Sequence, residues 1–259
     1  MSFPAGFSAT AFDDALATGG IGRNLIYRTT VDTTMGLARS EADAGAPHGT
    51  LVLAEEQTAG RGRRGRSFFS PPAENLYFTL ILRTPLETHR RLPIATPLAV
   101  AQAIRAEGVD ARIKWPNDIW IGERKVCGML IDAEITAEGG LAFVGIGINV
   151  NGDMSDNAEL RDIAVSIAQA LAHRVSRERL LARICNEFER VIELPAAELA
   201  EEYRLASMVL GRDITVHAMG KEPYEAVALT IEDDGGLRVR RADGTEETLV
   251  AADVSIRPG

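Results

Sequence analysis

The sequence predicts an α+β fold, in which a larger mixed domain is followed by a small β-barrel. Three observations support this prediction. Helix and strand patterns interleave over the first 204 residues, short strands with tight turns dominate afterwards, and 259 residues suffice for one large domain plus a small one. A chain of this length can bury a core without disulfides. We place the boundary near residue 205, which gives domains 1–204 and 205–259.

The helices are predicted from apolar spacing and from start and stop signals. The strongest pattern is amphipathic and carries Leu180, Ile184 and Phe188 on one side. An Ala-rich run ends at Gly108, a residue type that often follows a helix C-terminus. The predicted helices are residues 9–17, 35–44 (after an N-cap at 32–34), 97–107 and 177–194, with the rest of 1–25 a Gly-rich lead-in.

The strands are predicted from short apolar runs bounded by turn residues. In the second domain, glycine-containing polar pairs separate successive runs, as is typical of hairpins. Residues 57–72 are rich in Gly, Arg and Pro and are predicted to form a long loop. The predicted strands are residues 50–55, 76–82, 112–115, 119–121, 126–135 and 141–150, followed by 214–218, 225–231, 237–241 and 247–250.

Composition excludes several classes of protein. Hydrophobic residues make up 46% and charged residues 25%, which are typical of a soluble globular chain. No apolar run approaches the roughly 20 residues of a membrane helix, and Asp13 and Asp14 argue against a signal peptide. Two cysteines fit a reducing compartment, and a net charge of −9 argues against a nucleic-acid-binding chain. We therefore expect a cytoplasmic protein that binds neither membrane nor nucleic acid.

An arginine-rich run is the first segment that indicates chemistry. Residues 60–66 read GRGRRGR, in a chain whose net charge is negative. The guanidinium fork suits phosphate or carboxylate, and glycine lets the backbone approach an anion closely. The alternative is a solvated surface loop. A dinucleotide-binding reading is rejected because Pro71 and Pro72 follow where a helix should begin, and no acidic residue lies about 20 positions downstream.

Two further segments carry polar residues at marked positions. The chain has three lysines among 28 basic residues, and Lys114 and Lys125 lie close together on flanking strands. A compact ammonium group suits a moving phosphate, although chance placement is the alternative. Residues 145–151 read GIGINVN, and glycine within a strand indicates either close approach of a ligand or backbone, or a bulge. The chain lacks the Walker A, H-E-x-x-H and C-x-x-C motifs.

Taken together, these segments resemble the biotin protein ligases, which attach biotin to the carrier domains of carboxylases. The shared pattern is G-R-G-R-x-G-R, K-W-P-N-D, K-x-x-G-x-L with a following Glu134, and G-x-G-I-N, in that order. The resemblance covers residues 25–259. It implies a mixed-sheet catalytic domain of the class II synthetase and biotin–lipoyl ligase type, with an SH3-like C-terminal barrel. It also implies the enzyme-only type, because no N-terminal DNA-binding domain fits before residue 25.

The resemblance implies a two-step reaction. The carboxylate of biotin attacks the α-phosphate of ATP to give biotinyl-5′-AMP and pyrophosphate, and a lysine of a biotin carboxyl carrier protein then takes the biotinyl group. Mg²⁺ is the implied cofactor, and biotin and ATP are the substrates. We expect loop 60–70 to close over the adenylate, because water would hydrolyse the mixed anhydride. A homodimer through sheet edges is also expected.

The resemblance assigns roles residue by residue. Met35 stands where Asn is usual and Phe68 where Trp is common, so a polar contact to biotin and an aromatic contact are altered. Asp118 is the implied metal ligand. The implied catalytic residues are Lys125, Arg61, Arg63 and Lys114. The implied biotin-binding residues are Thr33, Thr34, Met35, Gln57, Arg61, Gly62, Arg63, Lys125 and Gly128. The implied nucleotide-binding residues are Arg61, Arg63, Arg66, Phe68, Lys114, Asn117, Lys125 and Asn149.

Three other functions are weighed against this one. A lipoate ligase has a related fold and the same adenylate chemistry, but the arginine run together with K-W-P-N-D favours biotin. A non-catalytic nucleic-acid binder is disfavoured by the net charge and by the lack of aromatic residues interleaved with the arginines. A biotin-sensing repressor is disfavoured by the short N-terminal segment.

Overall fold

A mixed sheet forms the larger part of the molecule. The computed structural model describes residues 6–62, 68–136, 139–218, 220, 222–250 and 252–256. The strands of the sheet are β1 (Leu25–Val31), β2 (Thr50–Gln57), β3 (Leu76–Thr84), β4 (Ala111–Lys114), β5 (Asp118–Ile121), β6 (Arg124–Thr136) and β7 (Gly139–Ile148). They lie in the order β1-β2-β3-β7-β6-β5-β4. The β1–β2 pair is parallel, and the other five pairs are antiparallel.

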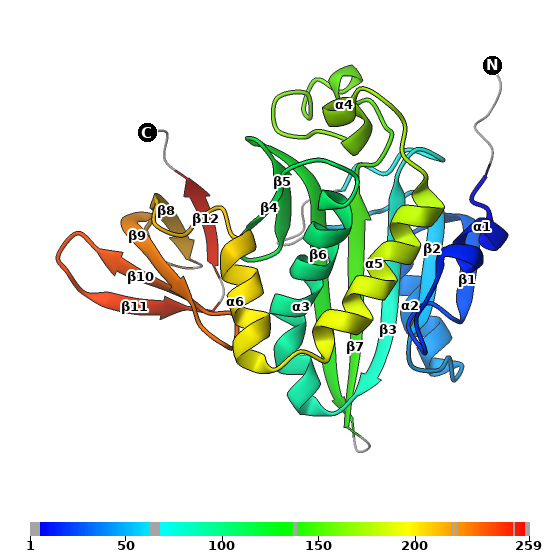
Figure 1. Ribbon diagram of the computed structural model, residues 1–259, viewed down its shortest axis with the longest axis horizontal. Helices are drawn as coiled ribbons and strands as arrows, with labels where there is room; N and C mark the ends of the chain where they lie inside the picture. The colour runs from blue at the N-terminus through cyan, green and yellow to red at the C-terminus, as the bar shows by residue number, and fades with distance from the viewer. Residues whose placement is uncertain are drawn as a thin grey trace.

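Helices cover both faces of this sheet unequally (Figure 1). Two long helices pack side by side on one face, and a shorter helix contacts the central strands from the other face. The helices are α1 (Ala9–Ala15), α2 (Thr34–Asp43), α3 (Leu86–Arg105), α4 (Ile167–Leu171), α5 (Arg177–Ile192) and α6 (Ala196–Ala206). The long pair is α3 and α5, and the shorter helix is α2. Among the described residues, no helix combines the length and apolarity that crossing a membrane requires.

The two faces follow from strand alternation. Successive side chains of a strand point to opposite faces. On β3, Phe78 and Leu80 enter the large core under α3 and α5, whereas Ile81 joins a small cluster with Ala38 of α2. The large core therefore lies on one side of the sheet, and most of the other side is left for α2 and a cavity.

A second sheet follows the helices. It is antiparallel, with the order β11-β10-β9-β8-β12. The indole Nε1 of Trp115 donates to the carbonyl of Gly235 at 2.9 Å, and Arg204 donates to the carbonyl of Ile231 at 2.8 Å, so the second sheet is tied to the first. Its strands are β8 (Asp213–Ala218), β9 (Tyr224–Ile231), β10 (Leu237–Arg241), β11 (Glu246–Leu249) and β12 (Ala252–Ile256).

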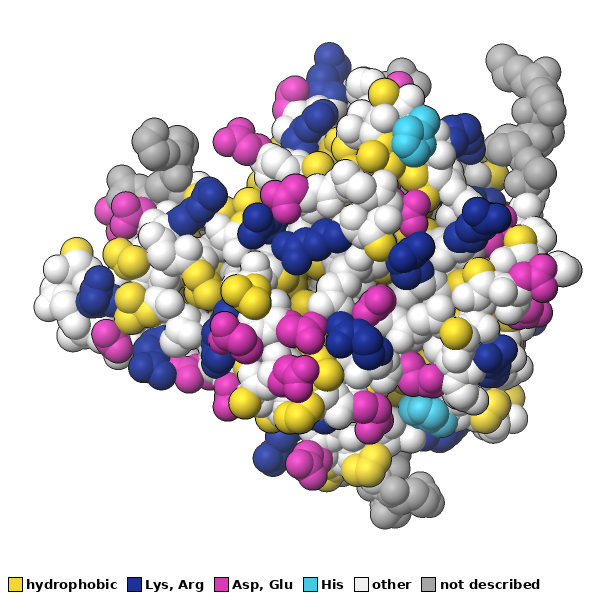
Figure 2. Space-filling view, viewed as in Figure 1, with side chains coloured by type: hydrophobic (Ala, Val, Ile, Leu, Met, Phe, Trp, Pro, Cys, Tyr) yellow, Lys and Arg dark blue, Asp and Glu magenta, His cyan; other side chains and the backbone are white. Residues whose placement is uncertain are grey.

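The helical face carries mixed charge. Figure 2 shows basic and acidic side chains interspersed on the side of the molecule where α3, α5 and α6 lie. Arg190 of α5, for example, contacts Glu187 at 2.9 Å and Glu202 of α6 at 3.1 Å. Such exposed pairs contribute little each, and among the described side chains visible on this face the two signs of charge are mixed.

The predicted fold class is confirmed, whereas several elements were missed. The sequence prediction omitted β1, α4, α6 and β12, and it began α3 at residue 97 instead of Leu86. Pro93 and Pro97 lie inside α3, where a proline normally ends a helix. Eleven buried residues along α3 pack into the core, and this packing outweighs the local preference. β1 is an edge strand with three exposed residues in its middle, so its apolar pattern was weak.

Candidate active site

A cavity of about 1130 Å³ opens on the sheet face opposite α3 and α5. Its walls come from the start of α2, the end of β2, the strands β4 to β7 and the second sheet. A volume of this size holds a ligand larger than a single vitamin or nucleotide fragment. The cavity is therefore the candidate active site.

The structure brings the sequence-predicted site residues together. Every one of them that the structure describes lines this cavity. Arg63 and Arg66, and with them the expected closure of loop 60–70, lie outside the described residues. The residues that line the cavity are Thr33, Thr34, Met35, Gln57, Arg61, Gly62, Phe68, Lys114, Asn117, Asp118, Lys125, Gly128 and Asn149.

Glycines form the floor of the cavity. Gly128 of β6 pairs directly with Gly147 of β7. A Cβ atom on Gly147 would lie 2.6 Å from the ring of Phe68, and one on Gly128 would lie 3.5 Å from it. Gly145 faces the thioether of Met35 in the same way, at 2.9 Å. The strand pairing is regular at Gly145 and Gly147, so the bulge reading is wrong. The groups that approach these glycines closely are side chains of this chain, rather than the ligand or backbone that the sequence reading expected.

A β-bulge turns Lys125 toward this floor. Ile119 of β5 pairs with Cys127, but the next residue, Trp120, pairs with Lys125, so Val126 is the extra residue. In a regular strand, residues 125 and 128 would face opposite sides of the sheet. Instead, the Nζ atom of Lys125 lies 2.8 Å from the Cβ position of Gly128. The bulge therefore places the lysine and the glycine on one face.

Lys125 is paired within the cavity. Its Nζ atom lies 2.7 Å from Oδ1 of Asp118, and the two side chains are 34% and 26% exposed. The neighbouring Cys127 is fully buried in the opposite core, and this burial raises the pKa of its thiol far above the usual range. Cys127 is thus an unreactive side chain that only fills the core, whereas Lys125 and Asp118 stay accessible to a ligand.

A hydrogen-bonded chain orients Gln57. The hydroxyl of Thr79 on β3 donates to the hydroxyl of Thr34 at 2.9 Å. The backbone N–H of Thr34 donates to Oε1 of Gln57 at 2.9 Å, and its hydroxyl lies 3.2 Å from the same oxygen. The amide nitrogen of Gln57 donates to Ser70 at 3.2 Å. Both the oxygen and the nitrogen of the Gln57 amide therefore have hydrogen-bond partners, and its N–H₂ group points toward Ser70, which follows the arginine run.

The other predicted residues hold fixed positions at the opposite end of the cavity. The ammonium of Lys114 lies 4.3 Å from the ring centroid of Trp120. Asn117 donates to the carbonyl of Met129. Asn149 is 7% exposed, and its backbone N–H donates to the carbonyl of Val126 at 2.9 Å. Strand pairing brings these residues together, although they are far apart in sequence.

Sequence reasoning missed several residues around the cavity. Arg39 of α2 pairs with Asp132 and Glu134 of β6, and its guanidinium lies 4.6 Å from the ring centroid of Phe143. Glu134 belonged to the recognised motif, but nothing in the sequence indicates its partner. The second sheet also lines the cavity, with His217, Asp253, Val254 and Ser255. These residues carry no motif.

The carboxylates at the site bear on metal binding. Within the described part of the chain, no group of three or more His, Cys, Asp or Glu side chains is arranged to hold a metal ion. Asp118 is engaged by Lys125. A metal at this site would therefore take most of its ligands from a substrate.

Comparison with known proteins agrees with the motifs and the two sheets. Models of the biotin/lipoate A/B protein ligase family and of the biotin protein ligase C-terminal domain match residues 26–151 and 209–257. The bifunctional ligase/repressor BirA of Bacillus subtilis is 33% identical over 98% of this chain and 80% of its own length. The biotin–[acetyl-CoA-carboxylase] ligase of Paracoccus denitrificans is 32% identical over 78% of this chain and 88% of its own.

A solved structure shares the whole architecture. Biotin protein ligase from Aquifex aeolicus in complex with biotin and ATP is 26% identical to this chain and has a TM-score of 0.74. The match covers 92% of this chain and 100% of the other. Both family models, the two relatives that are 32% and 33% identical, and the shared fold lead to one conclusion: the chain belongs to the biotin protein ligase family.

Proposed function

We propose that this chain is a biotin–[biotin carboxyl carrier protein] ligase. It activates biotin with ATP as biotinyl-5′-AMP and transfers the biotinyl group to a lysine of a carrier domain. One observation supports this proposal most strongly: every described residue to which the family motifs assign a role lines a single cavity. That cavity is large enough for the two substrates together.

The first step must overcome charge repulsion. A carboxylate oxygen of biotin attacks the α-phosphorus of ATP, and the bond to the β-phosphate oxygen breaks to release pyrophosphate. One cation 4 Å from a phosphate oxygen contributes about 4 kcal/mol at an effective dielectric constant near 20. Lys125 lies on the glycine floor and is assigned to bridge the two reacting groups. Arg61 and Lys114 add positive charge from the cavity wall.

The nucleotide end would include Mg²⁺. Mg²⁺ prefers oxygen ligands and is commonly held by one or two carboxylates together with substrate phosphates. Asp118 is such a carboxylate, and its place beside Lys125 fits a metal that enters with the triphosphate. The ion would neutralise phosphate charge there. Asn117 and Asn149 are assigned to the nucleotide from the same end.

The biotin end is built around Gln57, Thr34 and Met35. Gln57 and Thr34 present hydrogen-bonding groups fixed by their neighbours. Met35 supplies a thioether above Gly145 where the family usually has an amide. We expect biotin to lose one polar contact here and to gain packing against the sulfur. In the second step, the amine of the carrier lysine attacks the carbonyl carbon, AMP leaves, and the nitrogen loses its proton.

Further features of this function are also proposals. The free and buried Cys127 and Cys185 support a reducing, cytoplasmic setting. The domain boundary at residues 204 and 205 falls at the end of α6, before the second sheet. A homodimer would use sheet edges, and in the seven-stranded sheet these are β1 and β4. The net charge of −9 speaks against nucleic acid as a partner.

A labelling experiment tests the proposal. The purified chain is incubated with biotin and α-labelled ATP, with and without a biotin carboxyl carrier domain. We expect labelled biotinyl-AMP without the carrier, and a biotinylated carrier with it. Lipoate in place of biotin is the control acid. Absence of adenylate with biotin, or equal rates with lipoate, would contradict the assignment.

A further inference from the structure

A buried amide lies behind the cavity, and the family motifs quoted above give it no role. Asn75 is 1% exposed and directly precedes β3. Its side-chain oxygen accepts from the N–H groups of Val150 at 2.8 Å and Gly152 at 3.1 Å. Its side-chain nitrogen donates to the hydroxyl of Tyr77 at 3.0 Å. One side chain thus contacts two segments that lead into the cavity.

The oxygen of Asn75 holds the segment that carries Asn149. The ladder between β3 and β7 ends at the Leu76–Ile148 pair. Beyond that pair, the side-chain oxygen of Asn75 continues the contact between the two segments, because it accepts from the backbone N–H groups of Val150 and Gly152. A Cβ atom on Gly152 would lie 2.9 Å from the Asn75 nitrogen, so only glycine fits there beside the amide. Asn149 directly precedes Val150, and the Asn75 oxygen therefore holds the backbone next to Asn149.

The nitrogen of Asn75 holds the residues that follow the arginine run. Tyr77 is fully buried, and its hydroxyl donates to the carbonyl of Pro71 at 3.1 Å. Ser70, immediately before Pro71, contacts Gln57, and the ring of Phe68 lies 6.2 Å from that of Tyr77 in an edge arrangement. The position of Phe68 on the glycine floor is thus linked to Asn75 through Tyr77.

An amide is required because both hydrogen-bond directions are used. Tyr77 can donate to Pro71 because it accepts from Asn75. A carboxylate at position 75 could only accept, so the Tyr77 proton would turn to it and leave the carbonyl of Pro71 without its partner.

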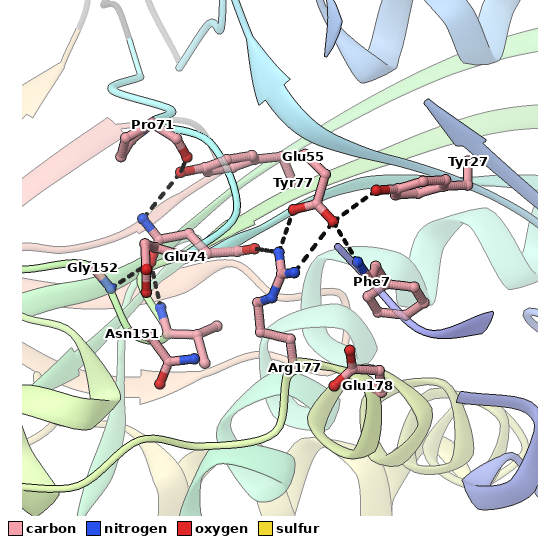
Figure 3. A network of polar contacts seen from close by, with 12 residues as sticks. Phe7, Tyr27, Glu55, Pro71, Glu74, Tyr77, Asn151, Gly152, Arg177 and Glu178 are labelled. Carbon is pink, nitrogen blue, oxygen red and sulfur yellow. Dashed lines mark hydrogen bonds and ion pairs between the residues drawn. The ribbon is translucent and has the colours of Figure 1, made fainter. Parts of the chain in front are cut away.

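A buried ion pair also contacts the backbone at this position. Arg177 donates to the backbone carbonyl of Asn75 at 3.2 Å. The same guanidinium contacts Glu55 at 2.5 Å (Figure 3).

We propose that Asn75 is a positioning residue that sets the nucleotide end of the cavity relative to the biotin end. Its oxygen places Asn149, and its nitrogen places Gln57 through Tyr77, Pro71 and Ser70. This inference rests on the proposed ligase function. It assigns to one amide the alignment of two substrates whose reacting atoms must meet within about 3.5 Å.

Three variants separate the two contacts. Tyr77→Phe removes the contact to Pro71 and leaves the oxygen of Asn75 in place. Asn75→Asp keeps acceptors for Val150 and Gly152 but redirects the Tyr77 proton. Asn75→Leu removes both contacts. The readout is biotin-dependent pyrophosphate exchange, which gives a KM for each substrate in the adenylation step alone. A matched control is Asn186→Leu, because Asn186 holds the backbone of Ala15 and Ala17 far from the cavity.

The expected pattern is a split between the two KM values. Tyr77→Phe and Asn75→Asp should raise the KM for biotin about fivefold, as expected for one lost hydrogen bond, and keep the KM for ATP within about twofold. Asn75→Leu should raise both. Asn186→Leu should lower the melting temperature and change neither. Asn75→Asp is thus a partial rescue relative to Asn75→Leu, because it should keep the KM for ATP near the wild-type value. An amide that served only the stability of the fold would not show this selective effect.

Three results would overturn different statements. An active wild type in which Tyr77→Phe and Asn75→Asp leave both KM values unchanged would refute the positioning role, even if Asn75→Leu fails to fold. A wild type that forms no adenylate would refute the proposed function. Equal changes of both KM values in all three variants would also refute the separation of the two contacts.

Discussion

At the scale of single residues, a methyl group would decide where the ring of Phe68 lies. In Gly147→Ala the new Cβ would lie 2.6 Å from two ring atoms of Phe68. Because an aromatic ring moves as one body, we expect a loss of about 1–3 kcal/mol of unfolding free energy and weaker ATP binding, since Phe68 is assigned to the nucleotide. Gly145→Ala is the control, since its closest contact would be the flexible side chain of Met35 at 2.9 Å. Urea denaturation with equal losses for both variants would contradict this.

The Lys125 ammonium is expected to matter for chemistry and little for folding. Its pair with Asp118 is partly exposed, and such pairs contribute at most about 1 kcal/mol. Lys125→Ala should therefore abolish pyrophosphate release with little change in melting temperature. Arg124→Ala, on the neighbouring exposed side chain, controls for loss of positive charge. Near-normal turnover of Lys125→Ala would remove this lysine from the mechanism.

Residue types reveal the site only in part. Lys114, Asn117, Lys125 and Asn149 were predicted because their motifs are specific, and all lie on one cavity. The bulge at Val126 could not be predicted, because one extra residue leaves no mark in composition. Asn75 was missed for a related reason: its partners lie near residue 150, and a lone asparagine before a strand is ordinary.

At the scale of elements, the loop before β1 depends on one carboxylate from α5. Glu189 accepts backbone N–H groups from Gly19 at 2.7 Å, Gly20 at 2.9 Å and Ile21 at 3.1 Å. Burial alone would raise the pKa of Glu189, but these three donors lower it overall. A lowered pKa in the folded state means that the stabilisation is present above the unfolded value near 4.3 and is lost as pH falls through the folded pKa.

We therefore expect Glu189→Gln to reduce the unfolding free energy by about 1–2 kcal/mol at pH 7. The difference from the wild type should shrink as pH falls from the unfolded value near 4.3 through the lower folded pKa, because only below the folded pKa is the carboxylate protonated in both states. Glu187→Gln is the control, since Glu187 only pairs with Arg190 at the surface. Thermal unfolding from pH 7 to pH 3 measures the difference in unfolding free energy between Glu189→Gln and the wild type. A difference that stays constant over this range would contradict the role of the Glu189 carboxylate in holding the backbone of residues 19–21.

Elements with strong local patterns were predictable, and those fixed by packing were not. The amphipathic run of α5 was predicted nearly to its ends because its apolar spacing is regular. α3 was cut short because Pro93 and Pro97 oppose a helix locally, while buried contacts on the sheet favour one. β1 is half exposed and its polar residues hide the alternation.

At the scale of the whole molecule, a buried ion pair joins segments that lie far apart in the sequence. Glu55 and Arg177 are about 5% and 7% exposed, and they contact at 2.5 Å. Glu55 also accepts from the N–H of Phe7 at 2.8 Å and from the hydroxyl of Tyr27 at 2.9 Å. Burial and the Glu55 carboxylate together raise the pKa of Tyr27 to about 12. The N-terminal segment, β1, β2 and α5 thus meet at one charge pair.

The direction in which the pKa of Glu55 is shifted determines how the unfolding free energy depends on pH. Burial alone would raise it, but the hydrogen bonds and charge of Arg177 lower it overall. The pair therefore stabilises the fold above the unfolded value near pH 4.3, and this contribution is lost as pH falls through the folded pKa. In Arg177→Met the hydrogen bonds from Phe7 and Tyr27 remain, but the stronger lowering influence of Arg177 is lost while burial stays, so the pKa of Glu55 rises. The gap in unfolding free energy between wild type and Arg177→Met should then narrow as pH falls from 7 toward 4.5.

Replacing one member of the Glu55–Arg177 pair should lower the unfolding free energy more than replacing both members. Arg177→Met leaves a buried carboxylate without its cation, and Glu55→Leu leaves a buried guanidinium, so each should cost about 3–5 kcal/mol at pH 7. The double variant Glu55→Leu/Arg177→Met buries no charge and should be more stable than either single variant. Urea denaturation of all four proteins completes the cycle. Additive losses in the double variant would mean that the two charges act independently, which contacts of 2.5 and 3.2 Å between their atoms do not permit.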